Sequence, residues 1–150
     1  MPTTEFSHTF AVAAPAGQVC AHLAEPANYL GLSPLVVEVR DVRRTGAAVS
    51  YVAVERFTLG PVHHDNLIAV TITVPLPDRR LVSDVVSPAR VRLTATVDLA
   101  PDGAGTRVTE TLRVTCPALL RRFVLGQARE VQRFRAAELT RRMAALSAPG

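Results

Sequence analysis

The sequence predicts an α+β fold in which a curved, seven-stranded antiparallel sheet wraps around one long C-terminal helix. Three observations lead to this expectation. The start of the chain alternates apolar and polar residues with a period of two, as a half-buried strand does. Runs rich in Val, Thr and Leu, separated by Gly and Pro, fill the middle of the chain, and a segment of helical period follows them. At 150 residues the chain fits a single domain that spans residues 1–150.

The opening elements are expected to be one strand and two short helices. The first strand, "TEFSHTFAV", places His8 and Phe10 on the same face. Pro15 can open a helix at its first turn. Pro26 then forces a break before a second short helical piece, "PANYLGL".

Six further strands are expected after Pro34. The turn signals between them include Thr45-Gly46, Gly60-Pro61 and the stretch "PDGAGT". Short turns at such spacing favour an antiparallel meander. The runs are "LVVEVRDV", "VSYVAVERFTL", "VHHDNLIAVTITV", "RLVSDVV", "RVRLTATVDL" and "RVTETLRVTC".

The longest helical segment begins at Pro117 and runs to about Leu146. It is amphipathic, and its apolar face should cover the sheet, because a sheet alone would leave one large apolar face in water. The apolar stripe contains Leu120, Phe123, Val124, Ala128 and Val131, and Arg122, Arg129 and Arg133 lie opposite.

Composition excludes several kinds of chemistry. All 17 basic residues are Arg, so only the N-terminal amine could form a Schiff base. Cys20 and Cys116 lie in apolar contexts and are expected to be buried free thiols. The sequence has no Gly-rich phosphate loop and no Gly-x-Ser-x-Gly elbow, so we expect no cofactor. No apolar run is long enough for a membrane helix and no signal peptide is recognised, which predicts a cytoplasmic protein.

Several short stretches accompany the order of strand, two short helices, six strands and long helix: Ala14-Pro15-Ala16, Val19, Leu23, Asn28-Tyr29, Pro34 and Gly105-Thr106-Arg107-Val108-Thr109. In this order and in these residues the chain resembles the SRPBCC superfamily. This is the helix-grip fold of START lipid-transfer domains, birch-pollen-allergen proteins and bacterial polyketide cyclase/dehydrase-like proteins. The resemblance implies a deep cavity between the sheet and the long helix for apolar or aromatic small molecules. It does not imply catalysis, because the superfamily mixes cyclases, hydrolases, carriers, hormone receptors and chaperone activators.

The stretch "PVHHDNL" contains the first candidate site residues. Neighbouring residues of a strand point to opposite faces, so His63 and His64 cannot bind one metal ion together, and no metal site is expected. The apolar residues that follow place His64 and Asn66 on the inner face. His63 and Asp65 should then point to water.

Other polar residues are expected on the faces that line the cavity. In the last strand Glu110 shares a face with Val108 and Leu112, and burial would raise the pKa of its carboxyl unless a partner offset it. In the third strand we favour the inward set that contains Tyr51 and Glu55, while the facing of the fifth strand stays open. Each polar candidate could instead be a satisfied core group. The remaining candidates for substrate binding are Gln127, Val131 and Phe134 on the long helix and His8 and Phe10 on the first strand.

Two functions fit these candidates. The first is a cofactor-independent cyclase or dehydratase for a polyketide-like or aromatic substrate, with His64 as the base and a protonated Glu110 as the acid. The second is a carrier or sensor that binds a lipid, isoprenoid or pigment without changing it. A protein-binding domain of the chaperone-activator type ranks third, and it predicts a filled cavity.

The arginines of the long helix suggest a partner. Seven arginines lie between Arg121 and Arg142, against only Glu130 and Glu138. They could form a solvated face or dock an acidic partner such as an acyl carrier protein or an anionic membrane surface. Nucleic acid fits poorly, since the chain has few aromatic residues and no recognised binding motif. The sequence leaves open whether the protein is a monomer or a homodimer.

Overall fold

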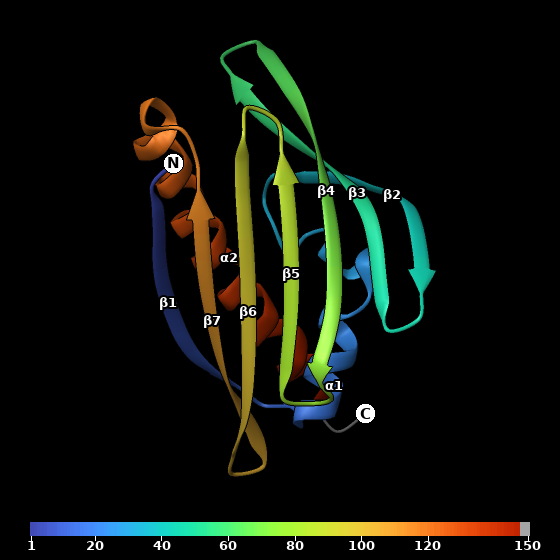
Figure 1. The fold of residues 1–150 in the computed structure, drawn as a ribbon. Coiled ribbons are helices and arrows are strands. Elements are labelled where there is room, and N and C mark those ends of the chain that lie inside the picture. The colour runs from blue at the N-terminus through green and yellow to red at the C-terminus, as the bar shows by residue number, and fades with distance from the viewer. Residues whose placement is uncertain (148–150) are drawn as a thin grey trace.

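A computed structural model of the chain, described over residues 1–147, shows one sheet with helices on a single face (Figure 1). The seven strands pair antiparallel in the order β1-β7-β6-β5-β4-β3-β2, so the helix-grip architecture predicted from the sequence is confirmed. The elements are β1 (Thr3–Val12), α1 (Ala16–Leu23), η1 (Pro26–Tyr29), β2 (Val36–Thr45), β3 (Ala48–Leu59), β4 (Val62–Leu76), β5 (Arg80–Ser87), β6 (Val91–Asp102), β7 (Gly105–Thr115), η2 (Ala118–Leu120) and α2 (Arg121–Ser147).

Two element boundaries differ from the expectation. The stretch "PDGAGT" is mostly strand, because Pro101 pairs with Thr106 and Asp102 pairs with Gly105. The turn is therefore only two residues long, and Gly103 takes the positive φ of 61° that such a turn requires. The long helix is preceded by the 3-10 turn η2, in which the Leu120 N–H donates to the Pro117 carbonyl.

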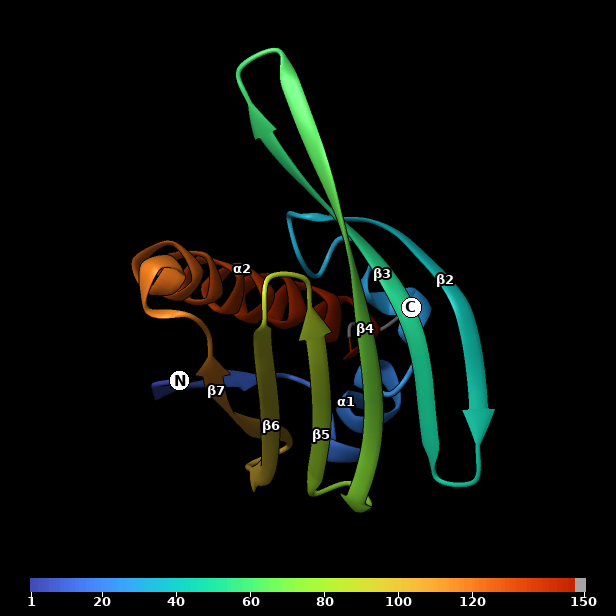
Figure 2. The ribbon, with the colours of Figure 1, turned by 45° about the horizontal axis from the view of Figure 1, so that its top comes forward.

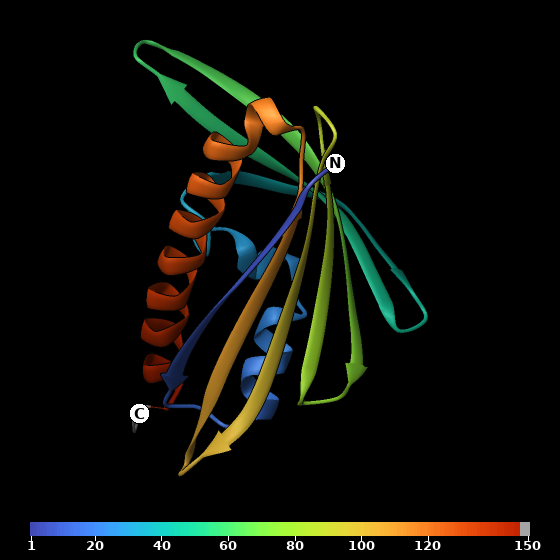
Figure 3. The same ribbon diagram turned by 60° about the vertical axis from the view of Figure 1, so that its left-hand side comes forward.

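The helix α2 lies along one face of the sheet, and α1 lies on the same face near the C-terminal end of α2 (Figure 3). The C-terminal half of α2 is packed, since Leu139 is 1% exposed and Met143 is buried in the cluster that includes Val19 and Val108. At the other end Leu119 is 99% exposed and Phe123 is 58% exposed. The helix therefore contacts the core closely at one end only.

The packed end of α2 is also tied to the short helices by polar contacts. Arg142 donates to the backbone carbonyls of Asn28 at 2.6 Å and Leu30 at 2.8 Å, and it also bonds Glu138 at 3.0 Å. These bonds satisfy carbonyls at the end of η1. They fix the segment that closes this end of the space between helix and sheet.

A close backbone approach occurs where β1 ends and the chain turns into α1. Val12 pairs with Thr106, and a Cβ added to Gly105 would overlap the carbonyl oxygen of Val12. Gly126 on α2 has open space around its Cα instead. Substitution of these two glycines by alanine is therefore expected to have opposite effects on stability.

We expect Gly105→Ala to lower the free energy of unfolding by about 1–3 kcal/mol, because the strand backbones must move apart. The matched variant Gly126→Ala should raise it by up to about 1 kcal/mol through helix propensity. Urea unfolding followed by circular dichroism measures both. Equal effects of the two substitutions would contradict this account of the β1–β7 pairing.

Candidate functional site

A cavity of about 500 Å³ lies between the sheet and the N-terminal half of α2. Its walls come from the inner faces of β3 to β7, from the segment around η1, and from one side of α2. Most of the surface is apolar, and Ile68, Val85, Leu112 and Val131 form its middle part. Volume and lining suit one small, mostly apolar molecule.

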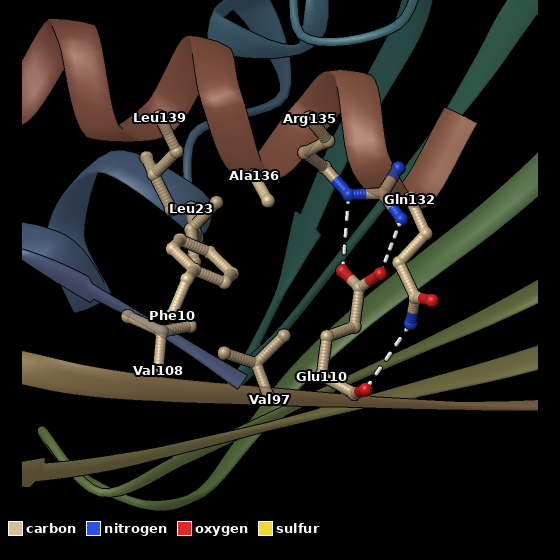
Figure 4. A pocket seen from close by; sticks show the side chains of 9 residues that line it. All are labelled: Phe10, Leu23, Val97, Val108, Glu110, Gln132, Arg135, Ala136 and Leu139. Carbon is tan, nitrogen blue, oxygen red and sulfur yellow. Dashed lines mark hydrogen bonds and ion pairs between the residues drawn. The ribbon is translucent and has the colours of Figure 1, made fainter. Parts of the chain in front are cut away.

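An ion pair between strand β7 and helix α2 forms the floor of the cavity (Figure 4). Arg135 donates from Nη2 to Glu110 Oε1 at 2.7 Å and from Nε to Oε2 at 3.0 Å. Glu110 is only 7% exposed. Gln132 donates to the backbone carbonyl of Glu110 at 3.1 Å and links the same two elements. Burial alone would lower the pKa of Arg135, but the neighbouring Glu110 carboxylate raises it above its ordinary value.

The floor separates the cavity from the packed core. On the far side of the ion pair lies a void of about 10 Å³, lined by residues that include Phe10, Leu23 and Leu139 (Figure 4). A void of this size holds one water at most. A ligand in the cavity would therefore end at Glu110 and Arg135.

Two tyrosines stand next to the ion pair. The rings of Tyr29 and Tyr51 are 6.0 Å apart, and both line the cavity. Burial raises the pKa of Tyr29 to about 12 and also raises the pKa of Tyr51, so both hydroxyls are protonated at neutral pH. The Tyr29 hydroxyl donates to the Leu23 carbonyl at 2.7 Å. The Tyr51 hydroxyl makes no hydrogen bond to another residue in the range 1–147 and can donate to a ligand.

A second polar group of side chains lies nearer the open end. Glu55 of β3 pairs with Asn66 of β4 across the sheet, and His64 Nε2 lies 3.0 Å from Asn66 Oδ1. Gln127 of α2 completes this group. Burial raises the pKa of Glu55, although Arg135 partly offsets the rise. Within the described residues the carboxyl of Glu55 and the amide of Gln127 have no hydrogen-bond partner.

The β3–β4 hairpin extends beyond the rest of the sheet (Figure 2), and its residues Phe57 and His64 line the cavity at that end. Phe57 of this hairpin and Phe123 of α2 have ring centroids 6.1 Å apart. The β5–β6 turn forms another edge, and Ala89 and Arg90 in it have positive φ values of 65° and 63°. Residues without glycine's freedom are strained in that conformation. The entrance is thus made of three separate chain segments.

Seven of the ten predicted site residues line this cavity: His64, Glu110, Asn66, Tyr51, Glu55, Gln127 and Val131. Their roles remain predictions. Arg135 supplies Glu110 with an ion-pair partner. His63 is exposed and Asp65 bonds Arg56 at 2.8 Å, so both point away from the cavity as expected.

Three predicted site residues, His8, Phe10 and Phe134, are not part of the lining of this cavity. His8 and Phe10 do face inward and stack at 5.8 Å, but β1 is the edge strand that lies under α2, so the helix covers them. Phe134 is 42% exposed. It precedes Arg135 by one residue, which turns it about 100° away around the helix.

Sequence reasoning missed Arg135, Tyr29 and Gln132. Arg135 was counted with the surface arginines, although it follows Val131 by four residues and Gln127 by eight and so shares their helix face. That spacing was the available signal. Nothing in the sequence indicated that Tyr29, in a 3-10 turn, would reach the floor.

The remaining arginines of α2 do not form one uniform face. Arg122 and Arg133 are exposed, Arg129 lies 4.5 Å over the ring of Phe6, and Arg141 bonds Glu138 at 2.6 Å. Docking of an acyl carrier protein stays a prediction. Among residues 1–147 no group of three potential ligands could hold a metal ion, and no helix is long and apolar enough to cross a membrane.

The chain belongs to the family described as "Polyketide cyclase / dehydrase and lipid transport", which matches residues 3–148. It is thus an SRPBCC polyketide cyclase-like protein with a cavity for a small molecule. A search of curated protein sequences gives no match.

Solved structures with the same fold include the Zhui aromatase/cyclase from Streptomyces sp. R1128, at 14% identity and a TM-score of 0.79 over 95% of this chain and 94% of that one. A START superfamily protein from Mycobacterium smegmatis has 15% identity and a TM-score of 0.73 over 95% and 99% of the two chains. The di-domain ARO/CYC BexL of the BE-7585A biosynthetic pathway has 19% identity and a TM-score of 0.75 over 99% of this chain, but only 51% of its own length is covered. At these identities the likeness establishes the fold alone.

Loss of the floor ion pair should destabilise the protein. We expect Arg135→Met to lower the free energy of unfolding by about 3–5 kcal/mol, because the Glu110 carboxylate is left buried without a partner. Arg133→Met, on the exposed side of the same helix, should change it by less than about 0.5 kcal/mol. Urea unfolding at neutral pH measures both, and similar values would contradict a structural role for the pair.

Because the pKa of Glu55 is raised, we expect the substitution Glu55→Gln to increase the stability of the folded state by an amount that depends on pH. The folded state holds this proton more tightly than the unfolded state, so stability falls as the pH rises and the carboxyl must ionise. The variant should be more stable than wild type at about pH 8, and the difference should vanish below about pH 3, where the carboxyl is protonated in both states. Thermal unfolding of both proteins across this pH range measures the difference in stability. A difference that becomes larger towards low pH would contradict the prediction.

Proposed function

We propose that the protein is a cofactor-independent cyclase or dehydratase that folds a polyketide-like or aromatic substrate inside the cavity. The observation that supports this is the presence of polar groups on the walls of an apolar chamber, of which Tyr51 and Glu55 have no hydrogen-bond partner among the described residues. Tyr51 is a donor beside the floor, and Glu55 and His64 lie nearer the entrance. A chamber that only stored an apolar molecule would not need them.

The proposed reaction begins with the proton on a carbon between two carbonyl groups. His64 removes this proton as a general base. The resulting enolate carbon attacks a second carbonyl of the same molecule, which forms the new C–C bond and leaves an alkoxide. The alkoxide takes the proton from the His64 imidazolium, which gives a hydroxyl group and returns His64 to its neutral form. Asn66 Oδ1 accepts a hydrogen bond from His64 Nε2 in the tautomer that leaves Nδ1 as the base, and the Nδ2 of Asn66 can then donate to the substrate.

The floor would orient and polarise the carbonyl oxygens. Tyr51 can donate its hydroxyl to one oxygen, and the Nη1 of Arg135 can donate to it as well, since Arg135 uses Nε and Nη2 for Glu110. Glu110 then positions Arg135 rather than acting as the acid.

Glu55 replaces Glu110 as the proposed acid of the dehydration step. Its pKa is raised, and it has no partner among the described residues. The proton of Glu55 goes to the departing hydroxyl group, and the C–O bond breaks to release water. Loss of the adjacent C–H proton to His64 completes the double bond.

A second candidate is a carrier for an apolar molecule with oxygen functions. The predominance of apolar side chains on the walls favours it, and the family description includes lipid transport. Native mass spectrometry of freshly purified protein would identify a bound molecule. Its recovery unchanged after incubation would favour the carrier.

The enzyme proposal is tested with a synthetic linear poly-β-ketone thioester, whose cyclised and dehydrated product is lighter by one water. Wild type should form a cyclic product faster than buffer does. His64→Ala and Glu55→Gln should each slow this by about 10²-fold or more. His63→Ala is the matched control, because His63 points to the other face, and its rate should equal wild type. Equal rates for all three variants would end the proposal.

A further inference from the structure

The charged groups that face the cavity are few and nearly balanced. Within residues 1–147 the lining contains one arginine, Arg135, two carboxyls, Glu110 and Glu55, and one histidine, His64. The Glu110 carboxylate balances the charge of the Arg135 guanidinium, and two hydrogen bonds of 2.7 and 3.0 Å join the two groups. The floor therefore has hydrogen-bond donors but no net positive charge.

A ligand oxygen at the floor would meet these donors in a nearly dry environment. The hydroxyl of Tyr51 and the Nη1 of Arg135 both lack partners among the described residues and can donate to an acceptor. A ketone or phenol oxygen would accept these bonds without adding charge. A carboxylate would add a second anion to a guanidinium whose charge Glu110 already balances, and an uncompensated buried charge is costly.

From this geometry we infer that the cavity selects ligands that place a neutral carbonyl or phenol oxygen at the floor, and that it rejects ligands with a carboxylate there. This inference specifies the ligand class of the proposed function. It rests on one part of that proposal, which is that the ligand binds in the cavity. It separates polyketide-like ketones and phenols from fatty acids of similar length. Glu55 reinforces the selection, since a second carboxyl on the wall also disfavours an anion.

The two polar groups of the lining indicate the length of such a ligand. Tyr51 at the floor and Glu55 nearer the entrance are four residues apart on β3, which corresponds to about 13 Å along a strand. The side chains between them in space are apolar, among them Ala53, Ile68 and Val131. The favoured ligand is thus an elongated apolar body with neutral oxygen functions near both ends.

The test compares two probes with the same aromatic body, 2-acetylnaphthalene and 2-naphthoate, by titration calorimetry of the full chain at neutral pH. Wild type should bind the ketone at least about tenfold more tightly than the carboxylate, a difference of one decade in Kd. Equal affinity, tighter binding of naphthoate, or binding of neither probe would each overturn the inference. This comparison needs no variant.

Variants then test whether the charge balance is the cause. Glu110→Gln removes the compensating charge, so naphthoate should bind at least about tenfold more tightly than it does to wild type. The double variant Glu110→Gln/Arg135→Gln is neutral again and should regain the preference for the ketone. Glu130→Gln, a carboxyl lost from the exposed side of α2, is the matched control and should behave as wild type. Unchanged selectivity in a folded Glu110→Gln protein would overturn the inference. If that variant does not fold, the affinities of wild type for the two probes still decide whether the cavity prefers the ketone.

The outcomes also distinguish this inference from the enzyme proposal. A protein that prefers the ketone but does not cyclise the poly-β-ketone thioester keeps the inference and loses the proposed activity. A protein that cyclises the thioester but binds both naphthalene probes equally keeps the activity and loses the inference.

Discussion

The ion pair between Glu110 and Arg135 is the interaction on which the site depends. A carboxylate on the inner face of β7 needs a partner, because an unpaired buried charge would shift its protonation or unfold the region. In this structure the helix α2 supplies that partner, the guanidinium of Arg135. The pair therefore fixes the rotation of α2 as well as its distance from the sheet. That rotation decides which helix residues reach the cavity.

The cavity exists because α2 is packed at one end and stands away from the sheet at the other. Leu139 and Met143 fill the space on one side of the ion pair, and Arg142 ties that end of the helix to the carbonyls of Asn28 and Leu30. On the other side Leu120, Phe123, Val124, Gln127, Ala128 and Val131 of η2 and α2 line the cavity, and the ring of Phe123 lies 6.1 Å from that of Phe57 on the projecting hairpin. The ion pair thus marks the boundary between the packed core and the ligand space.

Polar groups on a cavity wall have different uses according to their partners. Glu110, Arg135 and Tyr29 are committed to bonds within the protein and so hold the geometry, whereas Tyr51, Glu55 and Gln127 leave donors or acceptors facing the cavity. The second set suits the orientation and proton transfer that cyclisation and dehydration require. It would equally anchor a carried molecule, which is why the fate of a bound compound separates the two functions.

The sequence by itself determined the fold class, the order of the elements and the inward set of each strand that carries site residues. It could do so because period-two alternation and turn residues act locally, which is why His64, Asn66 and Glu110 were placed on the inner face without a structure. Only the tertiary structure decided which inward residues line a cavity and which are covered. His8 and Phe10 face inward yet lie beneath α2, and Arg135 turned from an apparent surface charge into the partner of Glu110. Both outcomes depend on where one long helix rests on the sheet, and that position is set by packing and charge pairing between residues far apart in the chain.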